Sequence, residues 1–385
     1  MRSAHANAWF MGAAFAAATL LAAPASHAQS CLSSAKTVET ATASKAAYDF
    51  STVGKAVKAA GVTWLNLPDN AVSVKGSQDA CFDGGYVDGP YPEDAVYECS
   101  AIHCPNGVCP NPCWAYHLSA GVSVQDTAPA VIEDVQVSDY GDGISQEESA
   151  NRAHMEVRRA YLHDIHDDAV ENDWGASVTV LDSLLERVNM GFASRQRSGV
   201  SIDARDRVFE VRNNLVLLHR FTNTYKEKYG HGGFWKWGHD GLDPRFAVTD
   251  NVFVAETPGD GLIFPLVDEV VECRNNKLLW VGTLADWDNE LNSDSDSDGL
   301  DSRGRMNALS YCYTVIVKPA SQSKADFLAQ HWDPLVAQWK ATHVAGGGTS
   351  SPGPTPTPTP APTPTPTPSP TPGPSAPPLQ PILLP

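Results

Sequence analysis

The feature of this sequence that most constrains its fold is a weak internal repeat between about residues 75 and 320. Short β-type segments recur in one register, and aligning one inward apolar position per segment gives spacings of 25, 23, 31, 37 and 25 residues. The aligned anchors are Ile132, Val157, Val180, Val211, Val248 and Cys273. Short spacings of this length are typical of one solenoid coil, and the longer ones indicate a coil with an inserted loop.

The repeat also predicts how neighbouring coils are joined. Asn214, Asn251 and Asn276 each follow an anchor by three residues, and stacked Asn side chains can bond backbone groups at a bend. Val and Leu alternate with polar residues, which suits strands that face a narrow apolar interior. The segments resemble the coils of the pectin-lyase-like superfamily, which implies an all-β, right-handed parallel β-helix. A β-sandwich is the structural alternative, but antiparallel strands would show tighter hairpin signals between the segments.

Three regions follow from the distribution of residue types. Residues 1–28 combine Arg2, an Ala-rich apolar run and a small-residue end at Ala28, which predicts a secretory signal. Residues 345–385 form a Pro/Thr-rich tail, holding 16 of the 29 prolines, for which we expect no packed structure. The β-helix domain is therefore predicted over residues 29–344, in a protein that is secreted, periplasmic or displayed at the cell surface.

A solenoid needs both of its ends covered, and two segments are candidates for short helical caps. Residues 43–60 have an amphipathic pattern suited to an N-terminal cap. Residues 324–341 have a helical pattern that Pro334 is expected to break or kink.

Charge and cysteine content exclude several partners. Without the signal segment the chain holds 26 basic and 45 acidic residues, a net charge of −19, which argues against a nucleic-acid partner. No later apolar run reaches 18 residues, so we expect no membrane span. We also expect a monomer whose partner is a polysaccharide. Eight cysteines in an exported chain predict disulfides, including a stapled loop around Cys99, Cys104, Cys109 and Cys113.

The repeat register brings acidic residues together. Asp142 follows its anchor by ten residues, as Asp167 does, so the two are predicted to stack on neighbouring coils about 5 Å apart, with Asp168 beside them. Carboxylates this close repel one another, so one of them keeps a proton or the group shares a cation. The first outcome predicts an acid/base pair, and the second predicts a calcium site.

Two further groups of residues are predicted to contact a substrate. Arg195 falls beside Glu171 and Asp173 on the next coil, close to Arg197. A second group lies on the insertion between the anchors Val211 and Val248, where aromatic rings could stack on sugars and an ammonium could grip a carboxylate. Its members are His231, Trp235, Lys236 and Trp237. The alternative for each of these residues is structural: a surface ion pair, a polar ladder or an aromatic plug.

The step Asp142-Gly143, followed one coil later by Asp167-Asp168, resembles the paired carboxylate motifs of polygalacturonases. This resemblance implies Asp167 as the general acid, with Asp142 and Asp168 positioning and activating water. The chain has Tyr140-Gly141 and Met190-Gly191 where that family has Asn-Thr and His-Gly steps, and its Arg-Ile-Lys signature is absent.

Two other functions use the same residues. In a calcium-dependent polysaccharide lyase the acidic residues would hold the ion, and Arg195 or Lys236 would be the base. A β-helix adhesin or glycan-binding scaffold would use the carboxylates only as structural or calcium-binding groups.

A separate acidic motif resembles the first half of a calcium loop, with a solvated acidic insertion as its alternative. Its carboxylates are Asp294, Asp296, Asp298 and Asp301. Arg305 stands where an EF-hand loop would need its bidentate Glu.

Overall fold

The computed structural model describes most of the chain between Ser30 and Val344. The described residues are 30–34, 37–42, 48–52, 55–67, 70–76, 80–89, 119–125, 129–147, 154–197, 199–219, 232–238, 241–258, 262–293 and 300–344. The predicted signal segment, the Pro/Thr tail and the predicted loop around Cys99, Cys104, Cys109 and Cys113 lie outside them.

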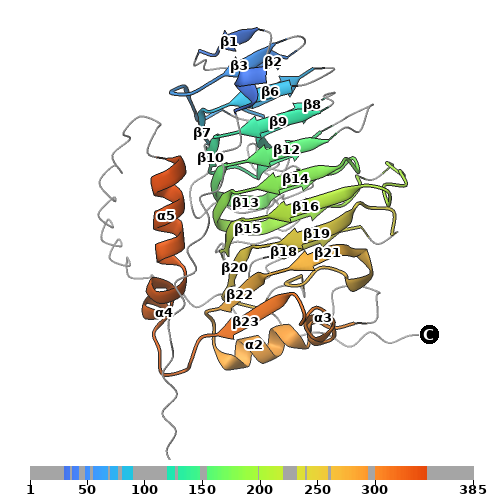
Figure 1. Ribbon diagram of the computed structural model, residues 1–385, viewed down its shortest axis with the longest axis vertical. Helices are drawn as coiled ribbons and strands as arrows, with labels where there is room; N and C mark the ends of the chain where they lie inside the picture. Colours follow the sequence, from blue (N-terminus) through green and yellow to red (C-terminus); the bar gives the residue numbers. More distant parts are fainter. Residues whose placement is uncertain are drawn as a thin grey trace, which may run out of the picture. The chain divides into compact units, whose positions relative to one another are not determined.

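Parallel strands dominate the structure and stack along one axis (Figure 1). One sheet has nine strands, all parallel, and we call it side A. Its strands are β1 (Val38–Thr40), β3 (Ala56–Lys58), β6 (Ala80–Asp83), β9 (Ala130–Glu133), β12 (Met155–Arg158), β14 (Val178–Leu181), β16 (Val208–Arg212), β19 (Arg245–Thr249) and β21 (Val270–Arg274).

The second sheet has 14 strands, because two long strands join two sides of the coil. Side B consists of β4 (Thr63–Leu65), β7 (Tyr86–Asp88), β10 (Gln136–Ser138), the first halves of β13 (Tyr161–Asn172) and β15 (Leu184–Ser194), β17 (Leu215–Leu218), β20 (Val252–Ala255), β22 (Asn276–Trp280) and β23 (Tyr313–Val317). Side C consists of β2 (Tyr48–Ser51), β5 (Val72–Lys75), β8 (Ala120–Gln125), β11 (Asp142–Gln146), the second halves of β13 and β15, and β18 (Gly233–Trp237).

The predicted fold class, a parallel β-helix, is confirmed. Each anchor pairs with the next one along side A, from Ile132 with Val157 through to Val248 with Cys273. The register also continues toward the N-terminus, where Ile132 pairs with Phe82 and Phe82 with Val57. All of these anchors except Cys273 are fully buried, so each coil contributes an apolar side chain to the interior core.

The coil bends at two corners, and at each corner one residue has the left-handed backbone conformation with positive φ. The residues at the corner between sides A and B have φ between 50° and 61°, and they are Asp134, Arg159, Asp182, Asn213, Asp250 and Asn275. The residues at the corner between sides B and C are Asp139, Asp164 and Arg187. Asn and Asp tolerate this conformation better than other L-residues, which explains why these two residue types recur at the bends.

The predicted asparagine ladder is present beside the first corner. The side-chain oxygen of Asn251 accepts from the backbone N–H of Asn214 at 2.9 Å and from its side-chain amide at 3.2 Å. Asn251 in turn donates to Asn276 at 3.0 Å and to the carbonyl of Val211 at 2.8 Å. The ladder therefore satisfies backbone groups that the bend removes from the sheets.

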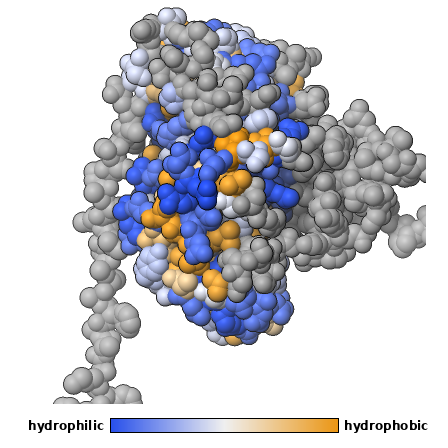
Figure 2. Space-filling model, turned by 90° about the vertical axis from the view of Figure 1, so that its right-hand side faces the viewer, coloured by the Kyte–Doolittle hydropathy of each residue, from blue (hydrophilic) through white to orange (hydrophobic). Residues whose placement is uncertain are grey.

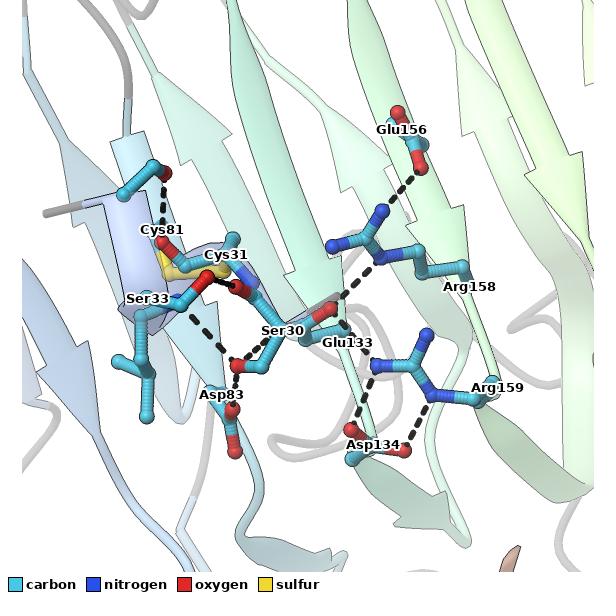
Figure 3. The surroundings of a disulfide bond; sticks show 12 residues. Ser30, Cys31, Ser33, Cys81, Asp83, Glu133, Asp134, Glu156, Arg158 and Arg159 are labelled. Carbon is cyan, nitrogen blue, oxygen red and sulfur yellow. Dashed lines mark hydrogen bonds and ion pairs between the residues drawn. A yellow bond between two sulfur atoms is a disulfide. The ribbon is translucent and has the colours of Figure 1, made fainter. Parts of the chain in front are cut away.

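The N-terminal segment is fastened to side A rather than free (Figure 3). The 3-10 helix η1 (Cys31–Ser34) is held by the disulfide Cys31–Cys81. Glu133, whose side chain is fully buried, accepts hydrogen bonds from the Cys31 backbone at 2.7 Å and from Arg158 at 2.6 Å. Arg158 neutralises the buried charge of Glu133, and these contacts together with the disulfide link the segment to three neighbouring coils.

The Ser30 hydroxyl joins Glu133 to a second carboxyl group, that of Asp83. Its oxygen lies 2.7 Å from a carboxylate oxygen of Asp83 and 2.7 Å from one of Glu133 (Figure 3). Burial raises the pKa of Glu133, but hydrogen bonds from Ser30 and Arg158 outweigh it and lower that pKa, whereas burial leaves the pKa of Asp83 raised. Of the two groups, Asp83 therefore binds a proton more readily than Glu133.

The predictions for the caps are partly wrong. Residues 43–60, predicted as an N-terminal cap, contribute strands β2 and β3 to the stack instead. At the other end, α2 (Leu284–Leu291) and α3 (Ser302–Ala308) cover the last coil, with Trp287 and Leu291 in its core, and the disulfide Cys273–Cys312 fastens them (Figure 1).

The predicted C-terminal helical segment is present, but it lies along side B. It forms α4 (Lys324–His331) and α5 (Asp333–His343), with Pro334 in the first turn of α5, as the sequence indicates. Trp339 donates to the carbonyl of Asp182 at 3.0 Å, and Lys340 pairs with Glu186 at 2.5 Å. The apolar outer positions of side B need this cover because they face away from the interior.

The side of the molecule drawn in Figure 2 has a mixed surface. Hydrophilic residues surround hydrophobic patches on the side of the molecule drawn in Figure 2. Among the described residues, no helix is long and apolar enough to cross a membrane.

Candidate functional site

The predicted acidic residues lie together on the outer surface of side C, just after the second corner. We call this group the acidic cluster, and it is formed by Asp142, Glu147, Asp167, Asp168, Glu171 and Asp173. Strands β11 and β13 carry four of these residues, Glu147 and Asp173 follow directly after the two strands, and β15 and β18 continue the same surface. The pairs Ser145–Glu171, Glu171–Ala193 and Ala193–Lys236 stand in one register across the four strands.

The predicted stacking of the two motifs on neighbouring coils is present. The Asp167 backbone N–H donates to the Gly141 carbonyl at 2.7 Å, which places Asp167 beside Asp142. The next backbone N–H, that of Asp168, donates to the Asp142 carboxylate at 3.1 Å. Because Ile144 then pairs with Val170, β13 has one residue more than β11 between Asp167 and Val170, which is a bulge.

The cluster has a buried part and a partly exposed part. Asp142, Asp167 and Asp168 are 5%, 3% and 0% exposed. Glu147, Glu171 and Asp173 are only partly buried, so they form the side of the cluster that solvent reaches. The Ser145 hydroxyl contacts two of them, Glu171 at 2.9 Å and Glu147 at 3.2 Å.

Lys236 is the cation at the centre of the cluster. Its ammonium donates to the Asp168 carboxylate and lies 4.0 Å from an oxygen of Asp167. Burial disfavours its charge, but Asp168 and Asp167 outweigh this and raise its pKa well above the ordinary value. Lys236 is therefore a fixed positive charge near neutral pH, and this argues against a role as a general base.

Several carboxyl groups of the cluster hold protons more tightly than usual. Burial, with a contribution from the charge of Asp167, raises the pKa of Asp168 to about 7. Burial also raises the pKa of Asp142 and Glu171 well above their ordinary values, with repulsion from neighbouring carboxylates adding to it. One positive charge cannot neutralise six negative ones, so the cluster holds protons at neutral pH unless a cation replaces them.

Three of these carboxylates could hold a metal ion. One oxygen each from Asp142, Asp168 and Glu171 lie within 4.8 Å of one another, which suits oxygen ligands on one calcium ion. The second oxygen of Asp168, Oδ1, is buried and has no hydrogen-bond partner among the described residues. The donor set therefore fits a hard divalent cation.

The two predicted arginines follow β15 or lie just beyond it, and both are exposed. The predicted contact of Arg195 with Glu171 and Asp173 stays a prediction. Burial raises the pKa of Asp173 and of Glu147, and the positive charge of Arg197 partly opposes this rise. The Arg197 backbone N–H also donates to the carbonyl of Asp173 at 3.0 Å.

The two tryptophans of the predicted substrate-binding group are core residues. Trp235 is 0% exposed and packs between Phe192 and Phe246, with ring centroids at 5.4 and 5.3 Å. Trp237 is 5% exposed beneath the guanidinium of Arg305 at 5.6 Å. The prediction of sugar stacking is wrong for Trp235, which is a core residue. The burial of Trp237 likewise favours the alternative, an aromatic plug. His231 lies outside the described residues.

The separate acidic motif is described only at its end. Asp301 accepts from the Gly304 backbone N–H at 2.7 Å and so forms the N-cap of α3. Asp294, Asp296 and Asp298 lie outside the described residues, so the calcium loop stays a prediction.

Sequence reasoning missed Ser145 and Glu147. Both follow Asp142 within the segment Asp-Gly-Ile-Ser-Gln-Glu, Ser145 at an outward position of β11 and Glu147 directly after the strand. Ser145 stands opposite Glu171, 26 residues later, so the predicted spacing of 25 residues between these coils does not reveal the pair.

Fold and site together define a parallel β-helix protein with an acidic cluster and one lysine on side C. Comparison of the chain with known protein families, with characterised proteins and with solved structures finds no match.

Proposed function

We propose that this protein is an exported, pectin-lyase-like β-helix enzyme that cleaves a polysaccharide by general acid/base hydrolysis at the acidic cluster. The observation that carries the proposal is the arrangement of six carboxylates around Lys236. Their environments differ, so some of these carboxyl groups bind a proton more readily than others. Such pairs of carboxyl groups with different proton affinities are what glycoside hydrolysis requires.

The two catalytic roles follow from exposure and charge. Glu171 is partly exposed and its pKa is raised well above the ordinary value, so it is the carboxyl group best suited to donate a proton to the glycosidic oxygen. Asp167 lies 4.0 Å from the Lys236 ammonium, which favours its ionised form, so it takes the proton of the attacking water. The resemblance to polygalacturonases implied that Asp167 is the general acid. We assign it the role of base instead, because the Lys236 ammonium lies beside it.

The remaining residues support these two. Asp142 and Asp168 are the buried pair that positions the part of β13 that carries Asp167. Lys236 and Arg197 offer positive charge to a sugar carboxylate, which favours a uronate-containing glycan as substrate. Export is supported by the two disulfides, which form and persist in oxidising compartments.

The test is a screen of the purified protein on uronate-containing, neutral and amine-bearing polysaccharides, with and without EDTA. Reducing ends and ultraviolet absorbance from unsaturated sugars are followed together. Hydrolysis predicts reducing ends without absorbance, and Asp167→Asn and Glu171→Gln lower the rate by about 100-fold or more. The matched control is Asp203→Asn, a carboxylate paired with Arg205 at the surface, which keeps the original rate. Absence of cleavage on every substrate contradicts the proposal and favours a glycan-binding scaffold.

A calcium-dependent lyase is the second candidate, favoured by the three carboxylate oxygens within 4.8 Å and by the unpartnered Oδ1 of Asp168. In that case Asp142, Asp168 and Glu171 would hold the ion, which would bind the substrate carboxylate and acidify the proton at C5. Absorbance that EDTA abolishes would establish this reaction in place of hydrolysis.

A further inference from the structure

The Lys236 side chain reaches a carboxylate that lies two strands away. Lys236 is on β18 and its ammonium donates to Asp168 on β13, with β15 between them. Neighbouring strands are about 4.8 Å apart, so the backbones of Lys236 and Asp168 are about 10 Å apart across the sheet, a gap that the two side chains bridge together. Its aliphatic stem therefore lies across β15.

Ala193 is the outward residue of β15 directly beside Lys236, where the stem begins its diagonal path toward Asp168, which stands opposite Met190. It pairs with Lys236 on one side and with Glu171 on the other. Phe192 belongs to the interior core, and side chains alternate along a strand, so Ala193 faces outward. Although it faces outward, Ala193 is 0% exposed. A stem that crosses the sheet at this position accounts for the burial, because lysine commonly lays its methylene groups over apolar surface.

We propose that Ala193 is a positioning residue of the acidic cluster, whose single methyl group leaves the space through which Lys236 crosses β15 to reach Asp168. The inference deepens the proposed function and rests on it for its catalytic meaning. A larger side chain at this position occupies the path of the lysine stem and turns the ammonium away from Asp167 and Asp168. The cluster then loses the cation that favours the ionised form of Asp167.

The experiment measures the chemical accessibility of Lys236, so it needs neither a substrate nor activity. The full-length protein is treated briefly with an amine-acylating reagent, and labelling of Lys236 is quantified by peptide mass spectrometry relative to exposed Lys58. The variants are Ala193→Leu, which fills the path, and Ala193→Ser, a control of nearly the same size. Thermal unfolding shows that each variant is folded, and Ala193→Val replaces the leucine variant if that one does not fold.

In Ala193→Leu we expect Lys236 to be labelled about tenfold faster than in the original protein, because its ammonium then leaves the buried contact with Asp168 and meets the reagent in solvent. Ala193→Ser should label at the original rate, and Ala193→Val should be intermediate. A folded leucine or valine variant with unchanged labelling overturns the proposal, and so does an equal rise in the serine variant. Failure of every polysaccharide assay would contradict the proposed function but would leave this measurement intact.

Discussion

Replacing Asn251 with alanine tests how far the asparagine ladder stabilises the solenoid. Asn251 occupies the middle of the ladder and is fully buried. Its side chain accepts from the Asn214 backbone N–H at 2.9 Å and donates to the Val211 carbonyl at 2.8 Å. Both backbone groups lose these partners in Asn251→Ala. A buried polar group left without a partner costs about 1–3 kcal/mol, so we expect a loss of about 4 kcal/mol of unfolding free energy.

The assay is equilibrium denaturation in guanidinium chloride, followed by fluorescence and by circular dichroism so that coincident curves establish one transition. The control is Asn289→Ala, the same substitution at an exposed position of α2, for which we expect a change within about 0.5 kcal/mol. Asn251→Leu keeps the volume without the hydrogen bonds and should lose as much as the alanine variant. A loss below about 1 kcal/mol in Asn251→Ala, or full stability in the leucine variant, would refute the reasoning.

Three further predictions concern charge and crosslinks. Because the pKa of Asp83 is raised from 3.8, its contribution to stability is complete below that value and declines as the pH rises through the raised one. Asp83→Asn, which has no ionisable group at this position, should remove this slope from a plot of Tm against pH; an unchanged slope would show that Asp83 is not its source. Lys236→Met should lower the unfolding free energy by about 3 kcal/mol at pH 8 and by less at pH 5, since the pKa of Asp168 is about 7 and protonation removes its buried charge; equal losses at both pH values in urea titrations would contradict this. Replacing Cys273 and Cys312 together with serine should cost about 4 kcal/mol in the same titration, from the chain entropy of a loop of 39 residues, and a loss below about 1 kcal/mol would show that the cap holds without its crosslink.

The sequence predicted side A closely because one physical rule governs it. Every anchor enters the same apolar interior, so a shift of one residue would turn its side chain outward. The recurrence of Asn214, Asn251 and Asn276 marks the first corner for a similar reason, since a bend in every coil leaves the same backbone groups to be satisfied. Periodicity alone therefore identified strands, register and ladder.

The elements that were mispredicted depend on contacts between distant parts of the chain. The pattern of residues 324–341 indicates amphipathic helices, but it does not say which apolar surface they cover, and side B offered one along its length. Trp235 sits in a run of aromatic and charged residues that suits a binding surface as well as a core. Only the pairing of β18 with β15 decides that it points inward while Lys236 points outward.

The residue that β13 adds after Asp167 has a chemical consequence. A regular coil would place a single carboxylate of this pair opposite Asp142 and turn the other inward or sideways. The added residue in β13 instead brings the Asp168 N–H onto Asp142 and keeps both carboxylates within reach of Lys236. Regular repeats build the scaffold, and the irregularity after the second corner concentrates like charges that a repeat would separate. Such a local departure from the period is where function is expected in a solenoid, because the crowded charges must hold a proton or a cation.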